Sequence, residues 1–301
     1  MASTSKTQGT LIAFGVATLG IACFSIMDAL MKGLAIALGT YNALLWRVLA
    51  LVAMAGLLFL VRRSPWPKRP AMRLHFIRGS MSSMMALLFF WGLARVPLAQ
   101  GVALAFVAPL IALYLAALLL KEKIERRAIY ASLVGFAGVL VILSAQAEAD
   151  LGPEAFRGAL AILASAGLYA WNIILMRQQA LAAGPVEIAF FTTLFMGSYF
   201  LAAAPFLAEA PPPDRLAEIV GAAFLAFLSI LLLSWAYARA EAQYLAPVEY
   251  TAFVWAVLLG WMVFAEPVRP LTILGAAMIV AGCIIAARRG APRVADPVAG
   301  P

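Results

Sequence analysis

Ten apolar runs, each long enough to cross a lipid bilayer, occupy most of this 301-residue sequence. A membrane-spanning helix needs about 20 predominantly apolar residues. Because the bilayer core offers no water to the backbone, each run must satisfy its own hydrogen bonds as a helix. The predicted helices are Leu11–Met31, Tyr41–Val61, His75–Leu93, Leu98–Leu120, Ala128–Ala145, Gly158–Met176, Val186–Phe206, Ile219–Ala238, Tyr244–Phe264 and Leu271–Ala287. The sequence therefore predicts an all-α membrane protein with ten transmembrane helices.

The composition agrees with this fold class. Residues are 65% apolar and 12% charged, whereas a soluble domain carries about 25% charged residues. The polar N-terminus, MASTSKTQGT, lacks the basic segment and the cleavage site of a signal peptide. The net charge is +8, but the basic residues cluster between the apolar runs, as topology signals do. We therefore expect membrane lipids around the protein and no nucleic-acid partner.

The distribution of Lys and Arg predicts the orientation. With the N-terminus in the cytoplasm, 16 basic residues face the cytoplasm and 5 face outward, and the opposite orientation would exchange these numbers. Because cytoplasmic loops carry the excess of Lys and Arg, both termini are expected in the cytoplasm of a multi-pass inner-membrane protein. Residues 1–10 and 288–301 are then cytoplasmic tails.

The two halves of the chain are related by an internal duplication. The stretch Leu87–Leu143 aligns without a gap to Leu231–Ala287, at an offset of 144 residues. Trp91, Arg95, Glu122 and Gly138 are identical to their partners, and composition alone does not place such residues. FSIMDALMK of the first run also aligns with YAWNIILMR of the sixth, at an offset of 145.

This duplication defines the predicted domains. Residues 11–145 form the first five-helix repeat, residues 158–287 form the second, and an extracytoplasmic linker at 146–157 joins them. An odd number of crossings per repeat inverts the second copy relative to the first. Many secondary transporters have this plan, with the substrate site between the repeats near the bilayer midplane.

Several motifs resemble the drug/metabolite transporter superfamily and, within it, the EamA-type ten-helix exporters. They are FSIMDALMK, Arg47 in LLWRVLA, Pro109, and the acidic hinges KEKIERR and AEPVRP, followed by Gly138 and Gly282. The resemblance covers about Leu11 to Ala287. It implies a basket of helices around a central cavity, with the fifth and tenth helices outside. The closest likeness is to amino-acid exporters, including those for aromatic amino acids.

Three ionisable residues inside the apolar runs are candidates for function, because a charge in the hydrocarbon costs roughly 2.5–3.5 kcal/mol on insertion scales. Asp28 and Arg47 lie at similar depths near the outer ends of their runs. They form either an outer gate with a proton-linked carboxylate, or a structural ion pair. Glu249 follows Pro247, a residue that kinks helices and exposes carbonyl groups. Glu249 either binds a substrate ammonium or a coupling proton in the cavity, or pairs with a basic residue at the interface.

A hinge and a cavity wall complete the predicted site. Pro109, midway along the fourth run, is a candidate hinge with Pro247, although a static kink explains Pro109 equally well. Aromatic, Met and Asn side chains make adaptable walls for mixed ligands. The candidates are Phe24, Met27, Met84, Phe106, Tyr169, Trp171, Asn172, Trp235, Tyr237 and Tyr250. The alternative for each is helix packing or the interfacial belt.

Other residues have structural interpretations. Glu122 and Glu266 are expected to cap helices or form ion pairs, and the single histidine, His75, to be an interfacial bystander. Gly135, Gly138, Gly275 and Gly282 permit close helix packing. One histidine and two cysteines within apolar runs make no metal site. The sequence lacks GxxxxGK[ST], and we expect no cofactor.

These features predict a monomeric secondary transporter, not an enzyme. It is expected to export small amphipathic metabolites, most of all amino acids, by alternating access. A lipid or lipid-carrier flippase of the same superfamily is the main alternative. A channel would need a continuous polar pore, and a membrane-embedded enzyme would need convergent catalytic groups. Transport direction and proton coupling stay open at this point.

Overall fold

All the elements of the computed structural model are helices within the part of the chain that it describes, residues 2–108, 110–112, 114–115, 126–148, 152–237, 248 and 250–287. They are α1 (Ala2–Leu38), α2 (Thr40–Val61), α3 (Arg69–Leu93), α4 (Leu98–Ala105), α6 (Arg126–Glu148), α7 (Gly152–Ala182), α8 (Pro185–Leu207), α9 (Leu216–Tyr237), α11 (Thr251–Phe264) and α12 (Pro270–Ala287), with a short 3₁₀ helix η1 at Pro213–Arg215. The prediction of an all-α protein is confirmed.

Every predicted run overlaps an apolar helix of the described residues. Over the described residues, six helices are long and apolar enough to cross a membrane: Ile12–Leu38, Thr40–Val61, Arg69–Leu93, Gly152–Met176, Pro185–Leu207 and Pro213–Leu233. Shorter apolar helices cover Leu98–Ala112, Leu133–Ser144, Thr251–Phe264 and Pro270–Gly282. The chain is thus an integral multi-pass membrane protein. That all ten runs cross the bilayer stays a prediction.

The ends of several helices differ from those of the predicted runs, and the differences in α1 and α4 concern the site most. The first run was expected to end at Met31, but α1 continues to Leu38 and stops at Gly39, which has a left-handed φ of 76°. Lys32 therefore lies inside a helix and not in a loop. The fourth run was expected to be one helix, but α4 ends at Ala105 and a turn follows at residues 106–107. A proline at position 109 has no N–H to donate to the Ala105 carbonyl, which explains the break. Pro109 itself lies outside the described residues.

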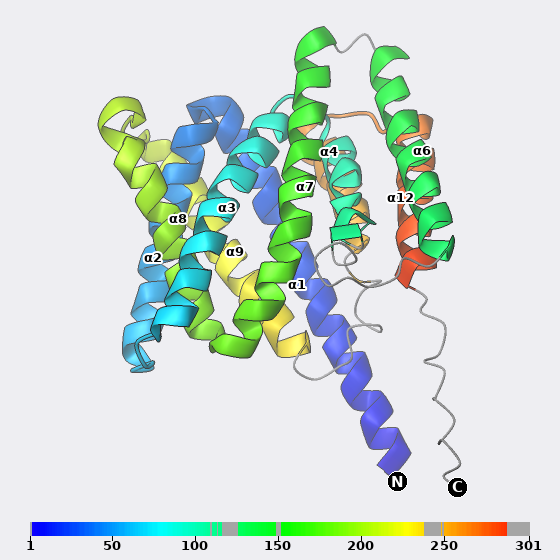
Figure 1. Cartoon of the computed structure of the whole chain (residues 1–301). Helices are drawn as coiled ribbons and strands as arrows, with labels where there is room; N and C mark the ends of the chain where they lie inside the picture. The colour runs from blue at the N-terminus through cyan, green and yellow to red at the C-terminus, as the bar shows by residue number, and fades with distance from the viewer. Residues whose placement is uncertain are drawn as a thin grey trace, which may run out of the picture.

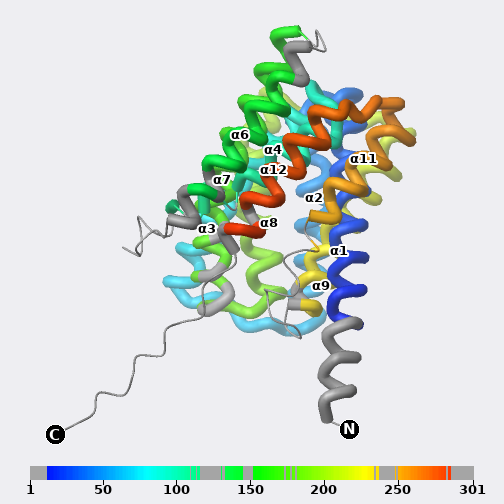
Figure 2. Tube along the Cα trace, turned by 90° about the vertical axis from the view of Figure 1, so that its right-hand side faces the viewer, coloured from blue at the N-terminus to red at the C-terminus, as the bar shows by residue number. Residues whose placement is uncertain are grey.

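The helices pack in pairs (Figures 1 and 2). The most extensive contacts join α1 to α9, α3 to α7, α2 to α8, and α6 to α12. Exchanging the two predicted repeats converts the α1–α9 pair into α7–α3 and leaves the other two pairs unchanged. A two-fold relation between the repeats produces this pattern of contacts.

The pair α2 and α8, equivalent in the two repeats, run antiparallel. Tyr41 at the start of α2 packs on Phe200 near the end of α8, and Phe59 at the end of α2 stacks on Phe190 near the start of α8. Equivalent helices that run in opposite directions favour inverted repeats, which stay a prediction for the chain as a whole. Figure 1 shows that α1 starts and α12 ends toward the same side of the bundle.

The largest hydrophobic core fills one half of the bundle. Buried side chains of α1, α2, α3, α4, α8, α9 and α11 meet there, among them Met31, Leu44, Leu93 and Phe200. This core adjoins the end of the bundle that carries Lys32 and Glu266, which we call the outer end after the orientation predicted from Lys and Arg. Apolar side chains therefore pack beneath the outer end.

Candidate functional site

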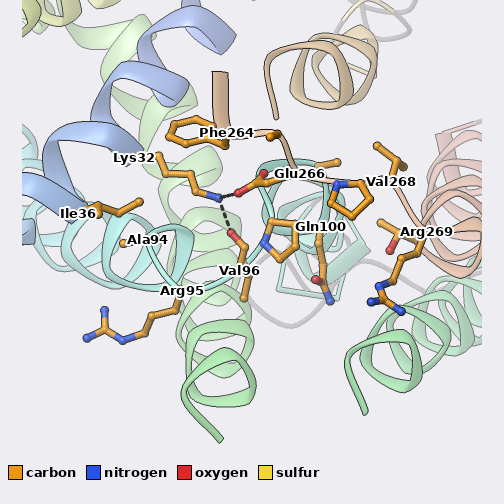
Figure 3. Close-up of a pocket in the computed structure, with 15 residues that line it drawn as sticks. Lys32, Ile36, Ala94, Arg95, Val96, Gln100, Phe264, Glu266, Val268 and Arg269 are labelled. Carbon is orange, nitrogen blue, oxygen red and sulfur yellow. Dashed lines mark hydrogen bonds and ion pairs between the residues drawn. The ribbon is translucent and has the colours of Figure 1, made fainter. Parts of the chain in front are cut away.

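A buried ion pair closes the outer end (Figure 3). Lys32 of α1 forms an ion pair with Glu266, in the linker between α11 and α12, and its ammonium donates to the carbonyl oxygen of Val96 at 2.6 Å. The other carboxylate oxygen of Glu266 accepts from the Leu98 amide at 2.7 Å. The Lys32 ammonium also lies 5.0 Å from the centre of the Phe264 ring. These contacts, which we call the outer latch, join the first predicted repeat to the second.

The backbone turns Glu266 toward the interior. Helix α11 ends at Phe264, and Ala265 adopts a left-handed conformation with φ 52°. The Glu266 amide then returns to the Gly260 carbonyl at 3.0 Å, which closes the turn as a helix C-cap. The prediction that Glu266 caps a helix or forms an ion pair is confirmed. Its partner, Lys32, was not anticipated.

A cavity of about 470 Å³ lies beside the outer latch. Gln100 and Thr272 line it together with Lys32 and Glu266. Figure 3 shows Arg95 and Arg269, which also line the cavity, directed away from the Lys32–Glu266 pair. The cavity therefore resembles a vestibule whose inner wall is the latch.

Asp28 and Arg47 lie about one helical turn below the latch. Both side chains are 6% exposed, and the described part of the chain contains no N–O contact between them short enough for an ion pair. One carboxylate oxygen of Asp28 and the Nε of Arg47 are buried without a hydrogen-bond partner. Arg47 instead lies over the Phe90 ring and donates to the Met27 sulfur at 3.7 Å. Each of these two oppositely charged groups thus keeps one buried polar atom without a partner.

The two rings predicted to be repeat partners meet in the structure. Phe106, in the turn that follows α4, packs edge-on against Tyr250, in the turn that precedes α11, with 5.4 Å between ring centroids. In both repeats this position lies in a turn, after α4 in the first and before α11 in the second. In membrane proteins, irregular backbone is tolerated where it is buried in protein or lines a cavity. The contact therefore marks a place where the two repeats approach each other.

A second polar cluster lies between α3, α7 and α8. The His75 ring bonds to Glu187 at 3.1 Å and to Gln179 at 2.7 Å. Arg78 donates to Gln179 at 2.6 Å and to Asn172 at 3.1 Å. The prediction that His75 is an interfacial bystander is wrong, because α3 begins at Arg69 and carries the ring to a fully buried position.

The remaining candidates differ widely in exposure. Asn172 and Met27 are buried, whereas Phe24, Met84, Tyr169 and Trp171 are more than a third exposed. Tyr250 and Phe106 are half-buried, and Trp235 is partly exposed. Pro109, Pro247, Glu249 and the side chain of Tyr237 lie outside the described residues. Lining of a central cavity by these residues stays a prediction.

Sequence reasoning missed Lys32, Arg78 and Gln179. Each lies near the end of an apolar run and looks like a flanking residue. The lengths of the helices could have revealed these residues, because α1, α3 and α7 all extend beyond their apolar segments. A basic or amide residue that stays helical beyond the apolar run can still face a neighbouring helix.

Comparisons with known proteins agree with the geometry. The chain is 26% identical over 277 residues to the pseudopaline exporter CntI of Pseudomonas aeruginosa, with 91% of this chain and 95% of that protein covered. It is 27% identical to a riboflavin transporter of Vibrio cholerae, over 68% of each chain. It is 24% identical to an S-adenosylmethionine uptake transporter of Rickettsia bellii, over 68% of this chain and 69% of that protein. These relatives are transporters of different small molecules, and none of the three is named as an amino-acid exporter.

A solved crystal structure shares the fold. It superposes with a TM-score of 0.59 at 22% identity, over 91% of this chain and 96% of that one. The profile of the EamA-like transporter family matches residues 11–144 and 156–288, which together form nearly the whole chain and coincide with the two predicted repeats. The chain therefore belongs to the EamA-like transporter family.

Proposed function

We propose that this secondary transporter exports small amphipathic metabolites, amino acids first among them, across the inner membrane by alternating access. The outer latch is the observation that carries this proposal. Lys32 and Glu266 belong to different repeats, and their contact closes the outer end above an apolar core. Relative motion of the repeats would break this contact and open the vestibule.

Asp28 and Arg47 support an amino-acid substrate. Each is buried, and each has a polar atom without a partner. Burying an unpaired charge is costly, so a ligand that supplies both partners gains binding energy. An amino acid carries an ammonium for Asp28 and a carboxylate for Arg47. The relatives transport other small molecules, which is consistent with a site that is adaptable outside these two charges.

The proposal includes the orientation of the protein in the membrane. Both termini are placed in the cytoplasm, because 16 basic residues then face the cytoplasm against 5 outside. The outer latch in this orientation faces the extracytoplasmic space, and the described structure corresponds to a state closed on that side.

Asp28→Asn is expected to lower transport of an amino acid by about tenfold to 100-fold, since a lost charge-assisted bond is worth about 1.5–3 kcal/mol. The full chain in liposomes would be assayed with labelled amino acids, nucleosides and cations, with and without a pH gradient. Asp214→Asn, at a carboxylate 74% exposed on η1, is the matched control and is expected to transport normally.

Two results would contradict the amino-acid proposal. One is transport by wild type of other solutes but of no amino acid. The other is an Asp28→Asn variant that transports amino acids as fast as the Asp214→Asn control. Binding of phospholipid or isoprenoid carriers without any solute transport would favour a flippase instead.

A further inference from the structure

A hydrogen-bonded chain runs through the polar cluster between α3, α7 and α8, away from the outer latch. Its members are largely buried side chains on three helices: His75, Arg78, Asn172, Gln179, Glu187 and Thr192. The cluster lies in the half of α3 nearest its start, which is the cytoplasmic half in the proposed orientation. The inference below rests on the proposed transport function and adds a ligand class to it.

Arg78 determines which groups of this network donate hydrogen bonds and which accept them. A guanidinium only donates hydrogen bonds, so the Gln179 atom that it meets at 2.6 Å is the carbonyl oxygen, Oε1. The amide nitrogen of Gln179 must then point the other way. It lies 2.7 Å from His75 Nδ1 and 3.2 Å from Thr192 Oγ1, and it donates to both.

This arrangement determines the protonation of His75. Because Nδ1 accepts from Gln179, it carries no hydrogen, and the proton of the neutral ring is on Nε2. Nε2 then donates to Glu187 Oε1 at 3.1 Å. The ring also stacks on Phe191, with 5.7 Å between centroids. One sequence of donors therefore runs from Arg78 through Gln179 and His75 to Glu187.

Arg78 forms no ion pair with a carboxylate of the described residues. Within the described residues its hydrogen-bond acceptors are the neutral amides of Asn172 and Gln179, and Glu187 is bonded to His75 instead. The guanidinium also interacts electrostatically with the Tyr169 side chain. A guanidinium whose described acceptors are both neutral can still pair with an anion, and a carboxylate matches its geometry.

A second proton on His75 would reverse the direction of donation along these hydrogen bonds. The proton adds at Nδ1, and Nδ1–H then faces the NH2 group of Gln179. The amide must rotate to offer Oε1 to His75, which turns its NH2 group toward Arg78. Two donors then face each other, so Arg78 loses this acceptor, while the new imidazolium pairs with Glu187. The released N–H group of Arg78 needs another acceptor, and a carboxylate supplies one.

We propose that this network is a second, proton-linked carboxylate site, separate from Asp28 and Arg47, in which Arg78 binds the carboxylate of a solute on the cytoplasmic side and His75 takes up a proton at Nδ1. Binding of the anion and binding of the proton favour each other, because both require the reversed Gln179 amide. The groups that contact His75 are Glu187 and Phe191 from α8 and Gln179 from α7, and Glu187 is the one described carboxylate among them.

The test uses the purified full chain in detergent, with benzoate as the probe and neutral benzamide as its control. Tryptophan fluorescence would follow binding, since Trp171 adjoins Asn172 on α7. Benzoate affinity is expected to rise by up to about tenfold for each pH unit lowered, because one proton binds with each benzoate. Benzoate is also expected to draw a proton from a weakly buffered solution containing a pH indicator, and benzamide to draw none.

Single substitutions test the role of each side chain in the hydrogen-bonded network. Arg78→Gln is expected to weaken benzoate binding at least tenfold, and Arg78→Lys to weaken it less. His75→Gln should bind benzoate with an affinity that no longer depends on pH. The control Arg157→Gln removes a guanidinium that is 66% exposed at the start of α7 and should behave as wild type.

The proposal is overturned if wild type binds benzoate without proton uptake, or if Arg78→Gln binds it normally. It is also overturned if His75→Gln keeps the pH dependence and Glu187→Gln removes it, because the proton would then be on the carboxylate. Linked benzoate and proton binding without amino-acid transport in liposomes would leave this site standing and reject the amino-acid proposal. Amino-acid transport without linked binding of benzoate and a proton would reject this site and leave the amino-acid proposal standing.

Discussion

Lys32→Met is expected to raise the labelling rate of a cysteine placed at Ala99 by about tenfold to 100-fold. Ala99 lines the cavity beside the outer latch and is 5% exposed. Without Lys32, the Glu266 carboxylate keeps its place but loses its cation, and this cost falls on the closed state alone. The closed state is expected to lose about 1.5–3 kcal/mol of free energy, the range for a hydrogen bond to a charged group. The larger cost of breaking a fully buried ion pair does not apply, because Glu266 retains some exposure to solvent.

The measurement uses a membrane-impermeant thiol reagent on intact cells, with Cys23 and Cys283 replaced by serine. Lys32→Arg keeps the positive charge and should show a smaller increase. The double variant Lys32→Met/Glu266→Gln should label more slowly than Lys32→Met, because no carboxylate is left unpaired. Equal labelling rates in wild type and Lys32→Met would show that the ion pair does not hold the outer end closed.

Gly92→Ala is expected to destabilise the protein by about 1–3 kcal/mol, the usual cost of overpacking. An added Cβ at Gly92 would lie 2.4 Å from the carbonyl oxygen of Gly158 and 2.7 Å from Ile162 Cγ1. The backbones of α3 and α7 touch at this crossing, so the Gly158 carbonyl cannot rotate away. The two helices must separate, and the Arg78–Gln179 contact between them is expected to loosen as well.

Gly167→Ala on α7 is the matched control, because an added Cβ there meets nothing within 4 Å. It is expected to be neutral or to stabilise by up to about 1 kcal/mol, since alanine favours the helix more than glycine. Thermal unfolding in detergent, followed by circular dichroism, would compare the two variants. A Gly92→Ala variant that melts no lower than Gly167→Ala would show that the crossing is not close-packed.

The close packing predicted at glycines is present where α6 crosses α12. Gly138 and Gly275 do meet, since an added Cβ on either would lie 2.6 Å from the carbonyl oxygen of the other. The contact joins α6 to α12 directly. Small residues on apolar helices predict close packing, but they do not say which helix supplies the partner surface.

The sequence by itself determined the helices, their apolar lengths, the duplication and the transporter family. It could do so because a helix in lipid satisfies its backbone hydrogen bonds locally, so that each run specifies its own structure. It also indicated the unusual depth of Asp28 and Arg47, because a charge inside an apolar run is visible in one dimension.

Only the tertiary structure decided which polar groups meet. Lys32 and Glu266 are 234 positions apart, and His75 and Glu187 are 112 apart. Their contacts depend on which faces of α1, α3, α7 and α8 pack together, and on helices that extend past their apolar runs. No local pattern encodes that packing, because it is set by the fit of side chains between helices that are distant in sequence.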